Sequence, residues 1–290
     1  MIFRSLLQRS FIALFFLALI SGCSTVGALM NKNFQAPQAS VSNVSISGLS
    51  FDAANLLFDI NVNNPNSVGI KLSGFDYDLA INGNGFLNGI NSDGLEIAAG
   101  AAKNVQIPLS ISFADLYRTF QSVQTQDSSE FALKAGLSFN VPILGDVRVP
   151  VSKSGFLPNV KLPKISVGAL KVSSMNLTGA DLELTVNMEN PNAFGLNMDK
   201  MQYLFQVNGK KWGAGETLKN VVVGKNGSGS MTIPLKLNFL EMGTTVYQLL
   251  RSNGAVNYQL SGNMDLGSTL KLLPKKSINF DKSGDVNIQR

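Results

Sequence analysis

The chain has 290 residues, of which 44% are hydrophobic and 15% charged, and its formal net charge is +5. It contains no histidine, which excludes Ser-His-Asp triads, histidine general bases and histidine metal ligands. The basic residues are scattered, and so weak a positive charge does not indicate nucleic-acid binding. The single cysteine excludes an intramolecular disulfide. We therefore expect a protein without enzymatic activity and without a cofactor or metal.

The N-terminal segment has the pattern of an export signal. Two arginines precede an apolar run over residues 11–20, which is too short to span a bilayer permanently. The run ends in Leu19-Ile20-Ser21-Gly22-Cys23, which resembles the bacterial lipobox. By this resemblance residues 1–22 are a signal peptide, cleavage falls between Gly22 and Cys23, and the Cys23 thiol is lipidated. The alternative is that Cys23 is an ordinary buried thiol.

The following segment, residues 23–40, is predicted to be a lipidated flexible tether because it is rich in small and polar residues. Two or more acyl chains hold a protein firmly at a membrane. Ser24 is not the aspartate that typically retains lipoproteins in the inner membrane. We therefore expect a protein anchored in the bacterial envelope through Cys23. In a host with two membranes, the sorting rules imply the outer membrane, with the protein facing the periplasm.

The rest of the chain repeats itself at an offset of 126 residues. The matches are Asn64-Pro65-Asn66 with Asn190-Pro191-Asn192, Gly69 with Gly195, Tyr77 with Tyr203, Asn82-Gly83 with Asn208-Gly209, and Ile107-Pro108-Leu109 with Ile233-Pro234-Leu235. Such a long period indicates two complete domains rather than solenoid units. We place them at residues 41–156 and 167–290, joined by a stiff linker with two prolines at residues 157–166.

Within each repeat, apolar residues alternate with the period of two that is typical of half-buried strands. One such row is Phe75, Tyr77, Leu79 and Ile81, and its phase slips just upstream, where Gly74 suits a β-bulge. A helical spacing interrupts the pattern at Leu116, Phe120 and Val123, and recurs at Met242, Val246 and Leu249. The prediction is an all-β fold of two tandem antiparallel β-sandwiches, each with about seven strands and one short α-helix.

These elements together resemble the WHy domain (water stress and hypersensitive response) of type 2 late embryogenesis abundant proteins. The likeness rests mainly on Asn-Pro-Asn after a strand, with an aliphatic-Gly pair following, and it covers both repeats. It implies a fibronectin-III-like sandwich and a role in desiccation or other water stress, with no catalytic site. Read physically, the motif is a turn: asparagine bonds nearby backbone, proline fixes φ, and Gly69 or Gly195 would permit a positive φ.

Other candidate sites have ordinary structural interpretations. Asp76 and Asp78 are expected on the solvated face of a strand, and Gly83–Gly89 and Gly224–Gly229 in turns between strands. Trp212 is either a partner anchor or, as we favour, a partly buried residue. The basic cluster Lys271, Lys275 and Lys276 is expected to be a solvated loop rather than a lipid-headgroup site.

The sequence leaves three functions open. The first is a non-enzymatic envelope lipoprotein that binds or shields envelope proteins or lipids during water stress. The second is a carrier of lipid or another hydrophobic ligand, held between the sheets of one domain. The third is a scaffold or accessory protein of an envelope complex.

Overall fold

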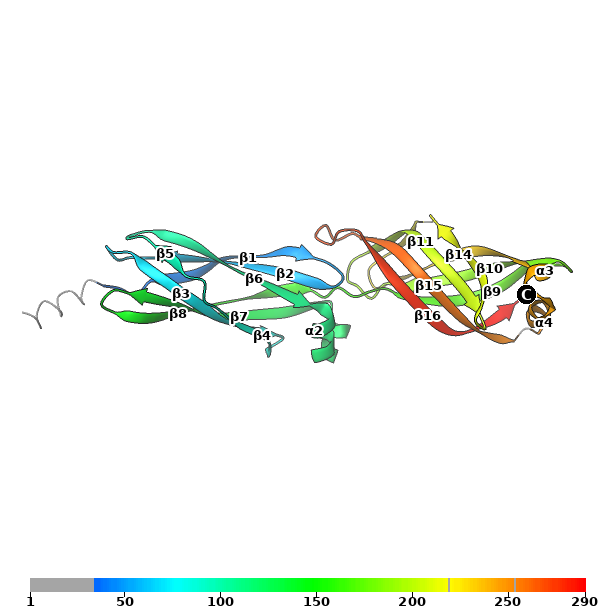
Figure 1. Ribbon diagram of the computed structural model, residues 1–290, viewed down its shortest axis with the longest axis horizontal. Helices are drawn as coiled ribbons and strands as arrows, with labels where there is room; N and C mark the ends of the chain where they lie inside the picture. The colour runs from blue at the N-terminus through cyan, green and yellow to red at the C-terminus, as the bar shows by residue number, and fades with distance from the viewer. Residues whose placement is uncertain (1–33, 219, 253) are drawn as a thin grey trace, which may run out of the picture. The chain divides into compact units, whose positions relative to one another are not determined.

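The computed structural model describes residues 34–218, 220–252 and 254–290 (Figure 1). Most of these residues lie in strands, and the few helices are short. The prediction of an all-β protein with tandem sandwiches is therefore confirmed. Each repeat contributes eight strands within the described residues rather than about seven.

The first repeat forms two sheets. Its strands are β1 (Gln38–Leu49), β2 (Ala53–Asn63), β3 (Ile70–Ile81), β4 (Asn84–Asn91), β5 (Leu95–Ile97), β6 (Ala102–Ser112), β7 (Ser128–Val141) and β8 (Gly145–Pro158). One sheet has the order β1-β2-β6, and the other has the order β4-β3-β7-β8 with β5 beside β3. Alternate residues of β2 are buried, and Phe58 of β2 contacts Phe131 of β7 edge-to-face at 5.7 Å between ring centroids. The core therefore lies between the two sheets.

The second repeat follows the same plan. Its strands are β9 (Lys164–Met175), β10 (Gly179–Glu189), β11 (Leu196–Val207), β12 (Lys210–Thr217), β13 (Val221–Val223), β14 (Ser228–Asn238), β15 (Ala255–Ser268) and β16 (Lys276–Gln289). Here the layers β9-β10-β14 and β12-β11-β15-β16 join at one edge, where Ile288 of β16 lies opposite Leu170 of β9 in a short parallel pairing. Every second residue of β10 from Ala180 to Met188 is buried.

The β3–β4 and β11–β12 hairpins turn at the repeated Asn-Gly pairs. Asn82 and Gly83 have φ of 48° and 79°, and Asn208 and Gly209 have φ of 48° and 75°. Positive φ at both central residues is the geometry of a type I′ turn, which suits the twist of the flanking strands. These two dipeptides therefore fix the register of their hairpins.

The predicted irregularity near Gly74 is confirmed. Between Leu72 and Gly74 the register of β3 against β7 shifts, so that Ser73 is the extra residue. The matching shift of β11 against β15 lies between Met198 and Lys200. Gly74 itself permits a close approach, since a Cβ there would lie 2.3 Å from the Asn91 carbonyl oxygen.

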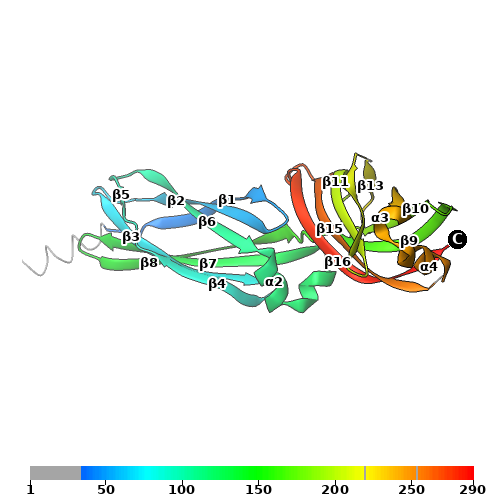
Figure 2. The same ribbon diagram turned by 45° about the vertical axis from the view of Figure 1, so that its right-hand side comes forward.

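Each repeat has a short helical segment where one was predicted, but the segment is interrupted in both repeats, and among the described residues only the second repeat has two α-helices. The first consists of α2 (Phe113–Thr119) and the 3₁₀ helix η1 (Gln121–Thr125), separated by Phe120 in a non-helical conformation. The second consists of α3 (Phe239–Met242) and α4 (Thr244–Arg251), separated by Gly243. Gly243 has a φ of 87°, which an α-helix does not accommodate. The α3 helix contacts β10 and β14 at one end of its sandwich (Figure 2).

The placement of both glycine-rich stretches in turns is only partly right. Gly83 lies in a turn, but Gly85 and Gly89 belong to β4, and Gly229 belongs to β14. Gly89 lies opposite Tyr77 on the neighbouring strand, and a Cβ at Gly89 would come within 2.7 Å of the tyrosine oxygen. The missing side chain therefore makes room for an aromatic ring across the sheet.

The described chain divides into two compact units whose bounds differ from those of the repeats. One comprises residues up to 46, 56–109 and 129–157. The other comprises residues 47–55 and 110–128 together with 158–290. The β1–β2 turn and the α2–η1 segment thus belong to the second unit. There, the Asn159 Nδ2 of the predicted linker donates to the carbonyl oxygens of Val123 and Gln126.

Candidate functional site

The predicted lipidation site, Cys23, and the residue before the predicted cleavage, Gly22, lie outside the described residues. The remaining predicted site residues belong to the two Asn-Pro-Asn motifs. Both motifs directly follow a buried strand, β2 in the first repeat and β10 in the second.

The first asparagine of the motif holds the turn together from inside. Asn64 is completely buried, and its Nδ2 donates to the carbonyl oxygens of Val68 at 2.8 Å and Ala98 at 3.0 Å. Its Oδ1 accepts from the backbone N–H and the Nδ2 of Asn66, both at 3.0 Å. One side chain thus joins the turn after β2 to the segment after β5.

The second asparagine clasps a segment that is distant in sequence. Asn66 Oδ1 accepts from the Gln35 backbone N–H at 2.8 Å, and Asn66 Nδ2 donates to the Gln35 carbonyl oxygen at 2.9 Å. The side-chain amide therefore satisfies both backbone groups of one residue, as a neighbouring strand would. This clasp fixes where the chain enters the first sandwich.

The second repeat has the same contacts. Asn190 Nδ2 donates to Phe194 at 2.7 Å and Gly224 at 2.9 Å, and Asn190 Oδ1 accepts from Asn192. Asn192 clasps Lys161 through two hydrogen bonds of 2.8 Å. Gln35 and Lys161 are themselves 126 residues apart, so the clasp follows the repeat.

These contacts leave the motif little capacity for a ligand. Both donors and both acceptor sites of the Asn64 and Asn190 amides are used within the chain. The prediction that the glycine after the motif adopts a positive φ is wrong, because neither Gly69 nor Gly195 does so. The turn is built by the asparagine side chains instead. Gly195 allows a close approach, and its N–H donates to Thr269 Oγ1 at 2.9 Å.

The two carboxylates of β3 do not form a pair. Asp76 accepts two hydrogen bonds from the Arg148 guanidinium of β8, from Nε at 3.0 Å and from Nη2 at 2.5 Å. This hydrogen bonding lowers the pKa of Asp76, with the positive charge of Arg148 adding to the effect. Arg148 reaches Asp76 across Gly136, where a Cβ would collide with the guanidinium. The exposed site is thus a cross-strand ion pair rather than an acid/base pair.

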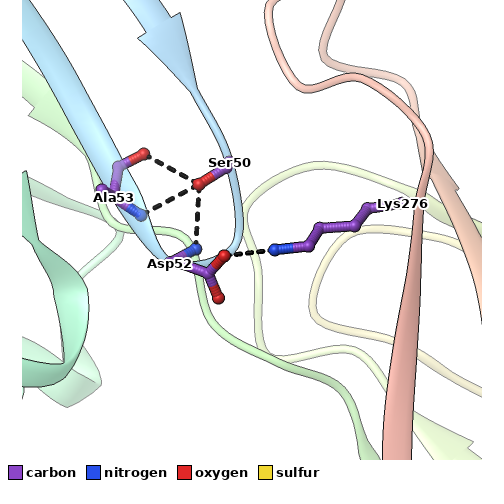
Figure 3. Close-up of polar contacts among 4 residues, drawn as sticks. All are labelled: Ser50, Asp52, Ala53 and Lys276. Atoms are coloured by element: carbon purple, nitrogen blue, oxygen red, sulfur yellow. Dashed lines mark hydrogen bonds and ion pairs between the residues drawn. The ribbon is translucent and has the colours of Figure 1, made fainter.

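Two lysines of the basic cluster have acidic partners. Lys275 is paired with Asp199, and Lys276 is paired with Asp52, both within the second unit. Figure 3 shows Lys276 reaching the β1–β2 turn, which Ser50 closes by accepting from the backbone N–H groups of Asp52 and Ala53. Lys271 is exposed. Neutralisation of two of the three cations weakens the lipid-headgroup interpretation.

Trp212 is more deeply buried than expected, with only 3% of its surface exposed. It therefore does not stand out as a partner anchor. Among the described residues no group of three or more acidic or cysteine side chains could hold a metal ion. The same part of the chain has no helix long and apolar enough to cross a membrane.

Comparison with known proteins accounts for the repeat. A family described as late embryogenesis abundant protein matches residues 59–155 and again residues 185–284. The chain belongs to this family. Each matched segment contains one Asn-Pro-Asn motif, so the family is represented here by two copies in tandem. The resemblance noted in the sequence is thereby confirmed.

Several plant members of the late embryogenesis abundant family are similar to part of this chain. Late embryogenesis abundant protein Lea14-A of Gossypium hirsutum is 25% identical over 46% of this chain and 87% of its own length. A desiccation-related protein of Arabidopsis thaliana is 24% identical over 46% of this chain and 78% of its own length. The solution structure of a late embryogenesis abundant protein covers 52% of this chain with a TM-score of 0.38 and 22% identity. The family thus links the chain to water stress.

Some residues of this late embryogenesis abundant protein were not singled out from the sequence. Gln35 and Lys161 are clasped through their backbone, so their side chains give no signal. Arg148 is distant from Asp76 in sequence. Tyr117 is largely buried and its hydroxyl donates to the Val160 carbonyl oxygen at 2.9 Å, and this burial raises its pKa. The only signal in the sequence is that Gln35 and Lys161 are separated by 126 residues, the offset of the repeat.

Proposed function

We propose that the mature protein begins at a lipidated Cys23 and acts in the bacterial envelope as a non-enzymatic protector against water stress. Membership of the late embryogenesis abundant family over both repeats is the observation that carries this proposal. The lipobox-like sequence before Cys23 supports the anchor. The two sandwiches would then be held at a membrane surface, where they bind or shield envelope components.

The internal hydrogen bonding of the sandwiches suits a protein that must survive drying. Among the described residues, every buried side-chain nitrogen or oxygen atom has a hydrogen-bond partner within the chain. Many proteins satisfy such groups with buried water, which drying removes. A fold whose buried amides, such as Asn64 and Asn190, bond only to protein keeps these bonds when water is withdrawn.

One end of the second sandwich supports binding of an envelope protein. Leu177 is 85% exposed and Leu240 is 81% exposed, and their segments are joined by a hydrogen bond from the Phe239 N–H to the Thr178 carbonyl oxygen. The first repeat has Phe51, which is buried, and Ala114 at the matching positions. The exposed leucines therefore belong to the second copy alone.

Lipidation is tested by metabolic labelling with a fatty-acid analogue. Cys23→Ala should abolish the label and leave the signal peptide attached, whereas Ser24→Ala should be labelled and processed normally. In a host with two membranes, Ser24→Asp should move the protein from the outer to the inner membrane on a density gradient. A labelled Cys23→Ala variant would contradict the proposed anchor.

The binding role is tested by photo-crosslinking in living cells. A photoreactive amino acid at Leu240 should give discrete adducts with envelope proteins under osmotic stress. The same group at Lys236, an exposed position on the neighbouring strand β14, should not. Equal adducts from both positions, or none from Leu240, would argue against this partner surface.

A further inference from the structure

A pocket of about 380 Å³ lies beside the β11–β12 hairpin and helix α4, within the second unit. Its apolar lining includes Val207, Trp212, Val246 and Leu249, and polar groups at its rim include Lys210 and Gln248. A volume of several hundred Å³ with apolar walls and a few polar groups is typical of small-molecule sites. None of these residues takes part in the Asn-Pro-Asn clasp.

A bulge in the hairpin sets the position of the tryptophan. Phe205 lies opposite Gly213 and Gln206 lies opposite Lys211, so Trp212 is the extra residue on β12. Bulges re-aim side chains and are common beside binding sites. The first repeat has the same bulge on β4, with Phe86 as its extra residue. The bulge that positions Trp212 therefore recurs in both repeats.

The two copies differ at a residue that would fill this space. Val246 on α4 corresponds to Phe120 at the offset of 126. A phenyl ring in the first copy is thus replaced by an isopropyl group in the second. At position 246 the pocket lining therefore has a smaller side chain than a phenylalanine would provide.

The polar groups of the pocket favour an anion. Its lining contains one charged residue, Lys210, which has no acidic partner among the described residues. Trp212 Nε1 likewise has no hydrogen-bond partner in the described chain. In that part of the chain, every side-chain nitrogen or oxygen atom that is fully buried does have a partner, so Trp212 Nε1 is not fully buried. The indole N–H must therefore keep some contact with the open space. An ammonium group and an N–H donor together suit a carboxylate.

We propose that this pocket binds a small anionic amphiphile, a free fatty-acid carboxylate with a short to medium alkyl chain. The chain lies between Trp212, Val246 and Leu249, and the carboxylate accepts from Lys210 at the rim. This site is additional to the envelope role proposed above. All residues that line the pocket belong to the second sandwich, and binding there does not depend on drying or on a protein partner.

Trp212 is the only tryptophan of the chain, so its fluorescence reports directly on the pocket. The full chain is reconstituted in phosphatidylcholine vesicles and titrated with 8-bromooctanoate, whose bromine quenches tryptophan on contact. Saturable quenching is expected. The cationic analogue 8-bromooctylamine should give no saturable quenching.

Variants separate pocket binding from partition into the vesicles. Val246→Phe, which restores the residue type of the first copy, should abolish saturation, and so should Leu249→Phe at a half-exposed position that tolerates a larger side chain. Lys210→Gln should weaken binding about two- to fivefold, as expected for an exposed ion pair. Lys211→Gln removes the same charge outside the pocket and should bind normally.

The proposal is overturned if quenching is linear, if both phenylalanine variants still saturate, or if Lys210→Gln and Lys211→Gln behave alike. Vesicles made with bromine-labelled phosphatidylcholine provide a further arm. Strong quenching by these vesicles without added octanoate would show that Trp212 meets membrane lipid rather than a free carboxylate.

Discussion

The repeated asparagine clasp shows how single side chains can organise a β-sandwich. Each amide of the motif is buried and bonded to backbone groups of at least one distant segment. A buried amide that loses a partner leaves donors or acceptors unsatisfied, which costs more than the bond itself contributes. The motif is therefore sensitive to substitutions that preserve its shape but change its hydrogen bonding.

Asn66→Asp tests this sensitivity. The substitution keeps the size of the side chain but replaces the Nδ2 donor with an acceptor facing the Gln35 carbonyl oxygen and Asn64 Oδ1. We expect it to lower the free energy of unfolding by about 3 kcal/mol or more, measured by urea denaturation at pH 7. Asn104→Asp, at an exposed position of β6, should change it by no more than about 0.5 kcal/mol. Similar effects of the two variants would refute the clasp.

The Asp76–Arg148 ion pair predicts a dependence on pH. The pKa of Asp76 in the folded state lies below the usual value of 3.8, so the ion pair stabilises the fold fully at pH values above 3.8. The contribution is lost as the pH falls through the lowered pKa and Asp76 becomes protonated. Asp76→Asn should therefore lower the melting temperature slightly at pH 7 and leave it unchanged near pH 2. A constant difference across this range would mean that the charge of Asp76 is not involved.

At this scale the sequence reveals the motif but not its partners. Asparagine beside proline indicates a turn, since both residues act locally. Gln35, Lys161 and Arg148 act on residues that are distant in sequence, so local patterns do not identify them. The burial of Trp212 depends on a bulge and on a helix from another part of the repeat. Local sequence patterns do not reveal either of them, so the sequence predicted only partial burial.

The helical segments show where periodicity is an incomplete guide. Leu116 and Val123 are buried as their spacing predicts, but Phe120 between them is half-buried and ends the helix. In the second copy Leu250, rather than Leu249, is buried beside Val246. Both leucines lie in α4 at helical spacings from Val246, Leu249 three residues and Leu250 four residues further on, so the spacing alone does not identify the buried one.

Truncations in this segment should reflect the observed burial. Leu116→Ala should lower the free energy of unfolding by about 2 to 5 kcal/mol, because Leu116 is completely buried. Phe120→Ala should cost less than Leu116→Ala, although it removes more atoms. Urea denaturation of both variants tests this order. A larger loss for Phe120→Ala would indicate an uninterrupted helical stripe.

Strands and turns were largely predictable because they depend on local chemistry. Alternating apolar residues define β2 and β10, and Asn-Gly pairs close the β3–β4 and β11–β12 hairpins. The glycines of β4 were misplaced, since glycine is also used where a strand must accommodate a neighbouring ring. Gly89 opposite Tyr77 is such a case, and only the cross-strand pairing distinguishes it from a turn glycine.

On the scale of the whole molecule, duplication of a late embryogenesis abundant domain has given two copies with the same internal clasp and different surfaces. The clasp recurs at Asn66 and Asn192, whereas the exposed leucines and the pocket beside Trp212 belong to the second copy. The shared features maintain the fold. The features that differ are the ones that we assign to partners and ligands.

Survival of cells after drying tests the central claim, that an anchored late embryogenesis abundant protein protects the envelope during water stress. A strain lacking the gene is complemented with the wild-type chain or with Cys23→Ala, and viable cells are counted after drying and rehydration. Wild-type protein should restore survival, and Cys23→Ala at equal abundance should not. Undiminished survival of the deletion strain, or full rescue by Cys23→Ala, would contradict the account.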